Sequence, residues 1–235
     1  MLERLSWHKL LSIIGDVHGK YPELFRVIEN CGSEYILQVG DLGFDYSPVV
    51  DYLDPNHFKF LRGNHDNYDV KIPHCLGDFG KVSFGDLNFF FIRGEYSIDM
   101  KARIETNKKI FPKKIWWRDE ELNRSNMEKA FKEYKKDKPK VMITHGCPYE
   151  ISKLIGIPGI LKHFGHDPKT FTTNTQQLLQ SCFDSNKPNV WIFGHMHQNL
   201  DFIHKGTRFI CINELCHIEY KDGDFININT LNKKF

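Results

Sequence analysis

Five short apolar runs along this chain each end in a cluster of glycine and polar residues, and this pattern constrains the fold more than any other feature. The runs are Leu10–Ile14, Tyr35–Val39, Phe58–Leu61, Lys140–Ile143 and Val190–Phe193. Short, nearly continuous apolar runs are typical of strands in a sheet that is covered on both faces. In open α/β sheets, functional groups gather just beyond the carboxyl ends of the strands. The sequence therefore predicts an α/β fold with its functional site at these strand ends.

Helical and hairpin patterns fill the intervals between the runs. Apolar residues recur at helical spacing in three segments. These segments are 22–31, 119–136 and 170–183. Turn residues separate pairs of strand-like segments, which predicts antiparallel hairpins beside the parallel strands. The hairpins are expected at 81–93, 202–213 and 217–228. Because no repeat and no linker rich in Pro, Ser or Gly interrupts the 235 residues, we predict a single domain over 1–235, with an inserted loop or short helix at about 148–168.

Charge and cysteine usage exclude several classes of protein. Lys and Arg number 32 against 30 Asp and Glu, and the net charge of +2 gives no general attraction to nucleic acid or to an anionic membrane. No segment approaches 18 uninterrupted apolar residues, so we predict no membrane span. The six cysteines show no CxxC spacing. That usage is typical of reduced thiols and predicts a cytoplasmic protein.

The polar clusters contain the residue types that bind transition metals. Asp16 and His18 lie two positions apart after one run, and His195 and His197 have the same spacing after another. Residues at this spacing reach one ion when the chain turns after a strand. Three further candidates follow other runs, namely Asp41, Asn64 and His145. This nitrogen and oxygen set suits manganese, which we expect first, or iron, zinc, nickel or cobalt.

The number of candidate ligands bears on the chemistry. Seven ligands are too many for one catalytic ion with an open position, so we predict two divalent ions that share a bridging carboxylate. Such a pair lowers the pKa of a bridging water and holds both oxygens of an in-line phosphoryl displacement. We therefore predict hydrolysis of a phosphate mono- or diester through attack by a metal-bridging hydroxide. The leaving alkoxide needs a proton, and His65, next to Asn64, is the natural donor.

The polar clusters form five motifs in a fixed order along the chain. They are GDVHG at 15–19, GD at 40–41, RGNHD at 62–66, THG at 144–146 and GHMH at 194–197. This ordered set resembles the calcineurin-like metallophosphoesterase superfamily. The resemblance implies a four-layer α/β/β/α sandwich of mixed sheets, with the site at the rim of the central sheets.

The resemblance also implies how the ligands are shared between two ions. One ion would be bound by Asp16, His18 and His197. The other would be bound by Asn64, His145 and His195. Asp41 would bridge both ions, and His65 would act as the acid or as a contact of the transition state.

Two departures from the superfamily concern the groups around the phosphate. GDVHG and RGNHD are similar to the branch of protein phosphatases and dinucleoside tetraphosphatases, whose second motif continues into Asp-Arg-Gly. Here Gly40-Asp41 continues into Leu42-Gly43, without the arginine that holds phosphate. Asp45 is one residue out of register for orienting His65, and Asp66 is the alternative.

A later segment offers a substitute for that arginine. RGEYSID at 93–99, followed by Arg103 and Trp116-Trp117, is similar to a pattern in small bacterial and phage phosphohydrolases of the superfamily. We therefore expect Arg103 or Arg93, together with Asn64, to contact the substrate phosphate.

Other functions could use the same residues. A nuclease or a cyclic-nucleotide phosphodiesterase would need the same centre, and the basic segment 101–118 could attract a polyanionic substrate. A binding scaffold without turnover is a third hypothesis, although such proteins usually lose ligands that this chain keeps. The expected partner is a phosphorylated substrate: a phosphoprotein, a nucleotide or a nucleic-acid end. The sequence predicts no oligomeric state.

Overall fold

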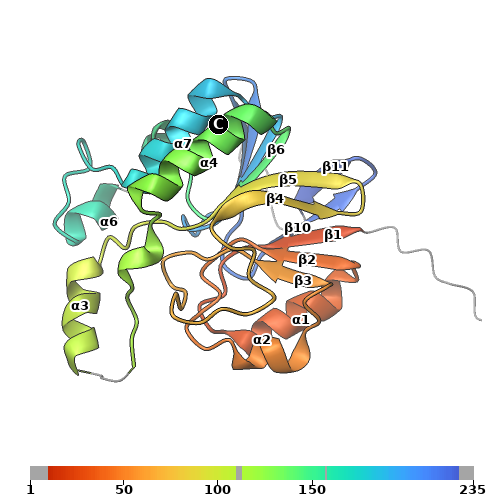
Figure 1. Ribbon diagram of the computed structural model, residues 1–235, viewed down its shortest axis with the longest axis horizontal. Helices are drawn as coiled ribbons and strands as arrows, with labels where there is room; N and C mark the ends of the chain where they lie inside the picture. Colours follow the sequence, from red (N-terminus) through yellow and green to blue (C-terminus); the bar gives the residue numbers. More distant parts are fainter. Residues whose placement is uncertain (1–9, 110–112, 157, 228–235) are drawn as a thin grey trace, which may run out of the picture.

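The strands form two mixed sheets in the computed structural model, which describes residues 10–109, 113–156 and 158–227 (Figure 1). One sheet has the strand order β11-β10-β1-β2-β3. Its strands are β1 (Leu11–Ile14), β2 (Tyr35–Gln38), β3 (Phe58–Phe60), β10 (His217–Lys221) and β11 (Asp224–Asn227). β1, β2 and β3 run parallel, whereas β10 pairs antiparallel with both β1 and β11.

The second sheet has the order β4-β5-β6-β7-β9-β8. Its strands are β4 (Phe79–Phe84), β5 (Leu87–Ile92), β6 (Val141–Thr144), β7 (Val190–Phe193), β8 (Leu200–His204) and β9 (Thr207–Cys211). The inner strands β5, β6, β7 and β9 are parallel, and antiparallel hairpins add β4 and β8 at the two edges. The predicted α/β fold with parallel strands and hairpins is therefore confirmed. Residue 228, the last of the third predicted hairpin, lies outside the described residues.

Three apolar clusters join the sheets to each other and to helices. Between the sheets, Ile13 shares a buried cluster with Phe91. On the far side of the second sheet, Tyr134 of a helix belongs to the cluster of Trp191, and on the far side of the first sheet Leu24 belongs to that of Ile36. The helices concerned are α1 (Tyr21–Cys31), α2 (Ser47–Tyr52), α4 (Arg124–Asp137) and α7 (Asn174–Ser185). In Figure 1, α4 and α7 lie above the two sheets and α1 and α2 lie below them.

Two predicted helices begin later than the apolar spacing indicated. The spacing places one start at 119, but α4 begins at Arg124, after Asn123, whose side chain accepts a hydrogen bond from the backbone of the first turn. The other start, placed at 170, is found at Asn174, after Thr173, which caps α7 in the same way. Such a cap satisfies a backbone N–H that has no partner inside the helix, and it defines where the helix starts.

Additional short helices lie in the segments that looked inserted. The segment at about 148–168, expected as a loop or short helix, contains two helices, α5 (Tyr149–Ile155) and α6 (Pro158–His163). The basic segment forms α3 (Met100–Lys109), followed by a 3₁₀ turn at Arg118–Glu120. Apolar spacing did not indicate α3 because its one buried side chain is a charged residue, Arg103. Figure 1 shows α3 and α6 at the same end of the molecule.

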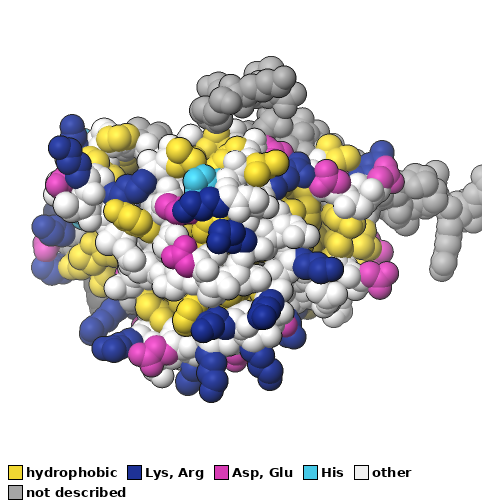
Figure 2. Space-filling view, turned by 90° about the horizontal axis from the view of Figure 1, so that it is seen from above, with side chains coloured by type: hydrophobic (Ala, Val, Ile, Leu, Met, Phe, Trp, Pro, Cys, Tyr) yellow, Lys and Arg dark blue, Asp and Glu magenta, His cyan; other side chains and the backbone are white. Residues whose placement is uncertain are grey.

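The exposed surface carries both signs of charge. On the face seen in Figure 2, Lys and Arg side chains are interspersed with Asp and Glu. Among the residues that the structure describes, none of the helices has the length and apolar character needed to cross a bilayer.

A buried carboxyl group links the end of β5 to the start of α7. Glu95 is 1% exposed, and its Oε1 accepts hydrogen bonds from the hydroxyl of Thr173 at 2.7 Å and from the backbone N–H of Tyr96 at 2.9 Å. Its Oε2 is buried without a hydrogen-bond partner. Burial raises the pKa of Glu95 from 4.5 to about 7, although the two hydrogen bonds oppose this change.

Replacing Glu95 with glutamine is expected to stabilise the metal-free protein at pH 8 and to change its stability little at pH 5. The folded protein binds the Glu95 proton more tightly than the unfolded chain, so its stability falls as the pH rises from 4.5 to 7. This difference in the pKa of Glu95 between the folded and unfolded chain corresponds to about 3 kcal/mol in the free energy of unfolding. Urea unfolding at both pH values tests the prediction. The control is Glu29→Gln, at an exposed position of α1. An equal effect of Glu95→Gln at the two pH values would contradict it.

Candidate metal centre

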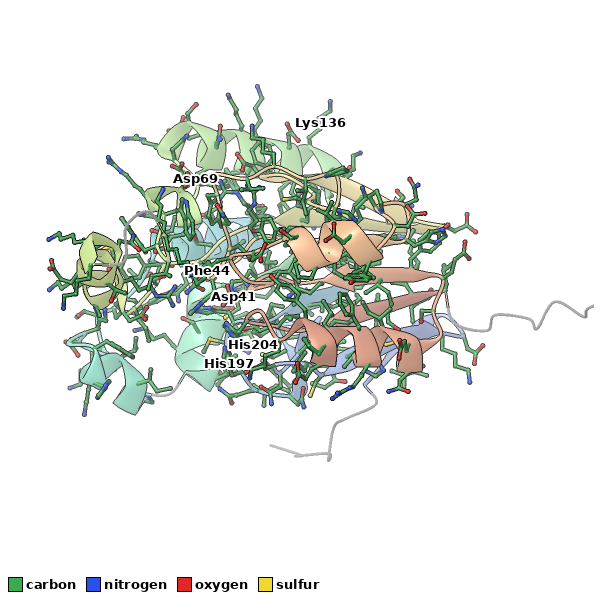
Figure 3. All side chains as sticks on the ribbon, turned by 90° about the horizontal axis from the view of Figure 1, so that it is seen from below. Asp41, Phe44, Asp69, Lys136, His197 and His204 are labelled. Atoms are coloured by element: carbon green, nitrogen blue, oxygen red, sulfur yellow. The ribbon has the colours of Figure 1, made fainter. Side chains whose placement is uncertain are left out.

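The loops after five strands bring the predicted ligands to one edge of the two sheets. Val17 and His18 donate backbone hydrogen bonds to the carbonyl of Asp41, which joins the loops after β1 and β2. His195 donates its backbone N–H to Oδ1 of Asp16 at 3.0 Å, which joins the first sheet to the second. In Figure 3, Asp41 and His197 lie toward the end of the molecule at which α3 and α6 project. Three groups of potential ligand atoms result, each within 4.8 Å. The groups are Asp16, His18 and His197; His18, Asp41 and His65; and Asp41, His145 and His195.

The first group fits a cation. Oδ2 of Asp16 lies 3.1 Å from Nε2 of His197 and 3.7 Å from Nε2 of His18, and these two ring nitrogens are 3.1 Å apart. Oδ2 is fully buried and accepts no hydrogen bond. A buried carboxylate oxygen without a donor is costly unless a cation satisfies it. Three converging ligand atoms of this kind suit a divalent transition metal.

The group of Asp41, His145 and His195 lies on the other side of the Asp41 carboxylate from His18. Oδ1 of Asp41 is 3.2 Å from Nε2 of His145, and Oδ1 of Asn64 is 3.3 Å from the same nitrogen. The other ring nitrogen of His145, Nδ1, lies 3.0 Å from the carbonyl of Val39. A hydrogen bond from Nδ1 to that carbonyl leaves Nε2 as the atom that binds metal, which is the usual support for a metal-binding histidine. The ring of His195 contacts that of His145, with centroids 5.0 Å apart.

The backbone at several predicted ligands is strained. His18, Asp41, His195 and His197 have φ angles between 49° and 61°, in the left-handed region that residues other than glycine rarely adopt. Each such residue costs on the order of 1–3 kcal/mol, and residues of this kind cluster at functional sites. The turns after β1, β2 and β7 therefore direct the candidate ligands toward one point. The contacts of the surrounding fold compensate the backbone strain that this requires.

Two glycines give the ligands room. A side chain at Gly63 would come within 2.3 Å of Oδ1 of Asp41 and 2.5 Å of Nε2 of His145, so it would fill the space between these ligands. Gly40 has a φ of 106°, and a side chain there would meet the His145 ring at 2.5 Å. The glycines of the GD and RGNHD motifs are thus needed for the close approach of backbone and ligand.

Opposite charges balance inside the centre. Burial opposes charge on all these groups, but the pKa of Asp16 is lowered by His18 and His197, and that of Asp41 by His145 and His65. Both groups are therefore carboxylates at neutral pH. His145 remains protonated for the same reason, because Asp41 outweighs burial and raises its pKa to about 10. A metal ion at this position would displace that proton.

Asp66 binds the backbone of the site and does not contact the ring of His65. Its Oδ2 accepts hydrogen bonds from the backbone of Asp41 at 2.8 Å and of Gly63 at 2.7 Å. Its Oδ1 accepts bonds from Leu42 and Gly43, and from the hydroxyl of Tyr46. These bonds tie the GD loop to the RGNHD loop. The sequence suggested Asp66 as the group that orients His65. In the structure, Asp66 instead positions the two loops. Asp45 is exposed and accepts from the backbone of Ser47.

Arg103 is the group that contacts the His65 ring. The Nη2 of its guanidinium lies against Nε2 of His65, and Nη1 donates to the carbonyl of Asn64 at 3.1 Å. Asp99, one turn earlier on the chain, pairs with Nε of Arg103 at 2.7 Å. Burial, with the charge of Arg103 adding to it, lowers the pKa of His65 to about 4 despite the nearby Asp41. His65 is therefore neutral here.

Arg93, the other arginine expected at the phosphate, is engaged elsewhere. Its Nε donates to Asp78 and its Nη1 to the carbonyl of Asp119, both at 2.6 Å, and its guanidinium lies 4.5 Å from the centre of the Tyr68 ring. The structure therefore brings Arg103 to the candidate centre and places Arg93 in the packing between β4 and the segment before α4.

Three residues near the ligands were not predicted. Ser97 contacts Asn64 directly, and Glu120 contacts Ser97. Oε2 of Glu214 lies 4.0 Å from Nδ1 of His197. Ser97 belongs to the RGEYSID segment that the sequence analysis singled out. For Glu120 and Glu214 we find no local sequence signal, since both are single acidic residues between strand or helix patterns.

Comparison with known proteins identifies the family. A family model described as calcineurin-like phosphoesterase matches residues 11–199. The chain belongs to this family. It is therefore a hydrolase of phosphate esters, and the carboxylate and imidazole groups described above are its candidate metal-binding residues. A search of curated proteins found no match.

Several solved structures are similar to this phosphoesterase at low sequence identity. A putative 5′-nucleotidase from Staphylococcus aureus is 14% identical with a TM-score of 0.53, over 94% of this chain and 52% of that one. Phosphopantetheinyl hydrolase from Mycobacterium tuberculosis is 12% identical with a TM-score of 0.48, over 89% and 91%. A predicted phosphoesterase from Streptococcus pneumoniae is 12% identical with a TM-score of 0.43, over 97% of each chain.

Proposed function

We propose that this phosphoesterase works with two divalent ions and that Asp41 bridges them. The position of the Asp41 carboxylate carries the proposal. Its Oδ1 lies 3.2 Å from Nε2 of His145 and its Oδ2 lies 3.9 Å from Nε2 of His18, so the two oxygens face two different groups of ligands. When bound, two such ions lower the pKa of the water between them and stabilise the oxygens of the phosphoryl group.

The remaining ligands divide between the two ions according to these contacts. His18 and His197 lie beside the buried Oδ2 of Asp16, and these three residues would hold one ion. Asn64, His145 and His195 lie on the opposite side of Asp41 and would hold the other. The mixture of carboxylate, amide and imidazole supports manganese first, with iron, zinc, nickel or cobalt as alternatives.

Arg103 would contact the substrate phosphate in place of the arginine missing from the second motif. Arg103 is 6% exposed, and its guanidinium lies against His65 and the Asn64 carbonyl, with Asp99 paired to its Nε. A planar guanidinium held in this way matches two oxygens of a phosphate. A cavity of about 310 Å³ lined by His18, Phe44 and His65 adjoins this group and gives the substrate room.

The contact between Arg103 and His65 limits when His65 can act as an acid. A guanidinium only donates hydrogen bonds, so the Nε2 atom that it contacts holds no proton. His65 could protonate a leaving alkoxide from Nε2 only after Arg103 has turned to the phosphate. We therefore propose that phosphate binding moves Arg103, so that Nε2 of His65 can take up a proton from solvent water and pass it to the oxygen of the leaving group.

A metal-loaded activity assay tests the proposed function. The protein with Mn²⁺ is expected to bind two ions per chain and to hydrolyse p-nitrophenyl phosphate or bis(p-nitrophenyl) phosphate; chelation should abolish turnover and Mn²⁺ should restore it. The preferred compound distinguishes a mono- from a diesterase. Full activity with one ion per chain would contradict the dinuclear centre. Failure to hydrolyse nucleotide, phosphoprotein or nucleic-acid substrates as well would overturn the function.

Among residues 10–109, 113–156 and 158–227, no feature favours the nuclease alternative. In the basic segment, Lys108 pairs with Glu105 at 2.6 Å and Lys114 pairs with Asp69 at 3.0 Å, which reduces its attraction for a polyanion. Trp117 is buried against Phe44 and donates its indole N–H to Asp69, so it packs and offers no exposed face to a base. The scaffold alternative has no support either, because the ligand groups converge. A cytoplasmic location remains the prediction from the cysteine pattern.

A further inference from the structure

The RGEYSID segment carries buried polar side chains at three alternate positions. Arg93, Glu95 and Ser97 are 6%, 1% and 1% exposed. Arg93 bonds Asp78 and Glu95 bonds Thr173, so each anchors a different neighbouring element. Polar groups at this depth persist only when they are hydrogen-bonded, and each bond then restricts the geometry of its partner. The contacts of Ser97 lead to the candidate metal centre.

Ser97 lies between Asn64 and Glu120 in a buried chain of hydrogen bonds. Nδ2 of Asn64 donates to the Ser97 hydroxyl oxygen at 3.2 Å. That hydroxyl donates to Oε2 of Glu120 at 2.6 Å, and the Ser97 backbone N–H donates to Oε1 of the same carboxylate at 2.8 Å. Asn64 is 4% exposed and Glu120 is 3% exposed. These hydrogen bonds are therefore shielded from bulk water.

The direction of each bond follows from the carboxylate. Burial raises the pKa of Glu120 from 4.5 to about 7, so at pH 8, the pH of the experiments below, the group is a carboxylate. A carboxylate only accepts, so the hydroxyl proton of Ser97 points to Glu120 and a lone pair of the oxygen is left for Asn64. A lone pair accepts from the amide nitrogen of Asn64 and repels its oxygen. Oδ1 of Asn64 must then face the opposite way, where it lies 3.3 Å from Nε2 of His145. Without this constraint, the two ends of an Asn amide have nearly the same shape and can exchange.

We propose that Ser97 and Glu120 are positioning residues, which orient the Asn64 side chain so that its oxygen and not its nitrogen faces the ion on the side of His145. The inference rests on the proposed dinuclear centre. Groups that orient a metal ligand through hydrogen bonds commonly contribute 10–100-fold to metal affinity. The RGEYSID segment thus supports both halves of the Asn64-His65 pair, since Asp99 holds Arg103 and Arg103 contacts His65.

Replacing Glu120 with glutamine tests the direction of the bonds without changing their shape. The new side-chain amide would need its oxygen for the Ser97 backbone N–H, which leaves its NH₂ group facing the Ser97 hydroxyl oxygen. The hydroxyl proton is then released toward Asn64 and favours the reversed amide. Ser97→Ala removes the acceptor altogether and leaves the carboxylate in place. Glu121→Gln is the matched control, because Glu121 bonds Thr175 of α7 and not Ser97.

Titration with Mn²⁺ measures the effect at each site. In both Glu120→Gln and Ser97→Ala we expect the affinity for one of the two ions to fall about 10–100-fold and that for the other to change little. Glu121→Gln should retain both affinities. Unchanged Kd values in folded Ser97→Ala, with wild type binding two ions, would overturn the positioning role and leave the proposed function intact.

A second measurement needs no metal and therefore separates the two proposals. The side-chain NH₂ signal of Asn64, assigned by its loss in Asn64→Asp, is followed by ¹⁵N NMR in the metal-free protein. We expect hydrogen exchange of this group to be at least about 10-fold faster in Ser97→Ala than in wild type, because a buried hydrogen bond is lost. Equal exchange in the two proteins would overturn the inference whether or not the wild type binds two ions.

Discussion

Replacing Asp41 with asparagine is expected to lower kcat for phosphoester hydrolysis by about 10³-fold or more, because a bridging ligand of both ions loses its charge. Metal ions stabilise the charge of the transition state by several kcal/mol, and losing that stabilisation lowers the rate by about this factor. The amide has the shape of the carboxylate, and its oxygen can still accept the backbone hydrogen bond that His65 donates to Oδ1 at 2.7 Å. The fold should therefore survive. Elemental analysis is expected to show fewer than two ions per chain.

A second Gly-Asp dipeptide in the same chain provides the matched control. Asp86 follows Gly85 in the exposed turn between β4 and β5 and belongs to none of the described ligand groups. Asp86→Asn should keep wild-type kcat and two ions per chain. If Asp41→Asn also kept both, Asp41 would not bridge the ions and the proposed division of ligands would be wrong.

The convergence of the candidate ligands could be predicted from sequence because each follows a strand closely. His18, Asp41, Asn64 and His145 lie within four residues of the ends of β1, β2, β3 and β6, and parallel register brings such ends to one edge. Strand periodicity therefore places them together before any contact is known. The same reasoning accounts for the confirmed α/β fold. Helix starts were less accurate, because Asn123 and Thr173 end the preceding loops through side-chain caps that apolar spacing does not detect.

The groups around the ligands could not be predicted in this way. Glu120 reaches Asn64 through Ser97, across 56 residues of sequence, and nothing in its local pattern distinguishes it from a surface acid. Asp66 lies in a recognisable motif, yet its role depends on donors from the loop after β2. Such partners are set by tertiary packing. Hydrogen-bond partners of this kind commonly tune the metal affinity of the ligands that they hold.

Replacing Arg103 with alanine is expected to lower kcat/KM by about 10²–10³-fold while leaving two ions bound, since loss of one donor to the transition state has an effect of this size. Arg103→Lys should recover only part of the activity, because a single ammonium cannot contact Asp99, the Asn64 carbonyl and the phosphate together. The pKa of His65 should rise in Arg103→Ala, since the positive charge of Arg103 contributes to its low value. NMR titration of His65 measures this change.

The design of the Arg103 experiment separates a phosphate contact from a structural role. Arg103 is the buried side chain of α3, so α3 could loosen when it is removed. A structural role predicts lost metal and a lower Tm together with lost activity, whereas a phosphate contact predicts lost activity with both retained. Arg118→Ala, at an exposed arginine beyond α3, should change none of these quantities. Wild-type kcat/KM in folded Arg103→Ala would mean that another cation, such as one of the metal ions, holds the phosphate, because Arg93 is committed to Asp78 and Asp119.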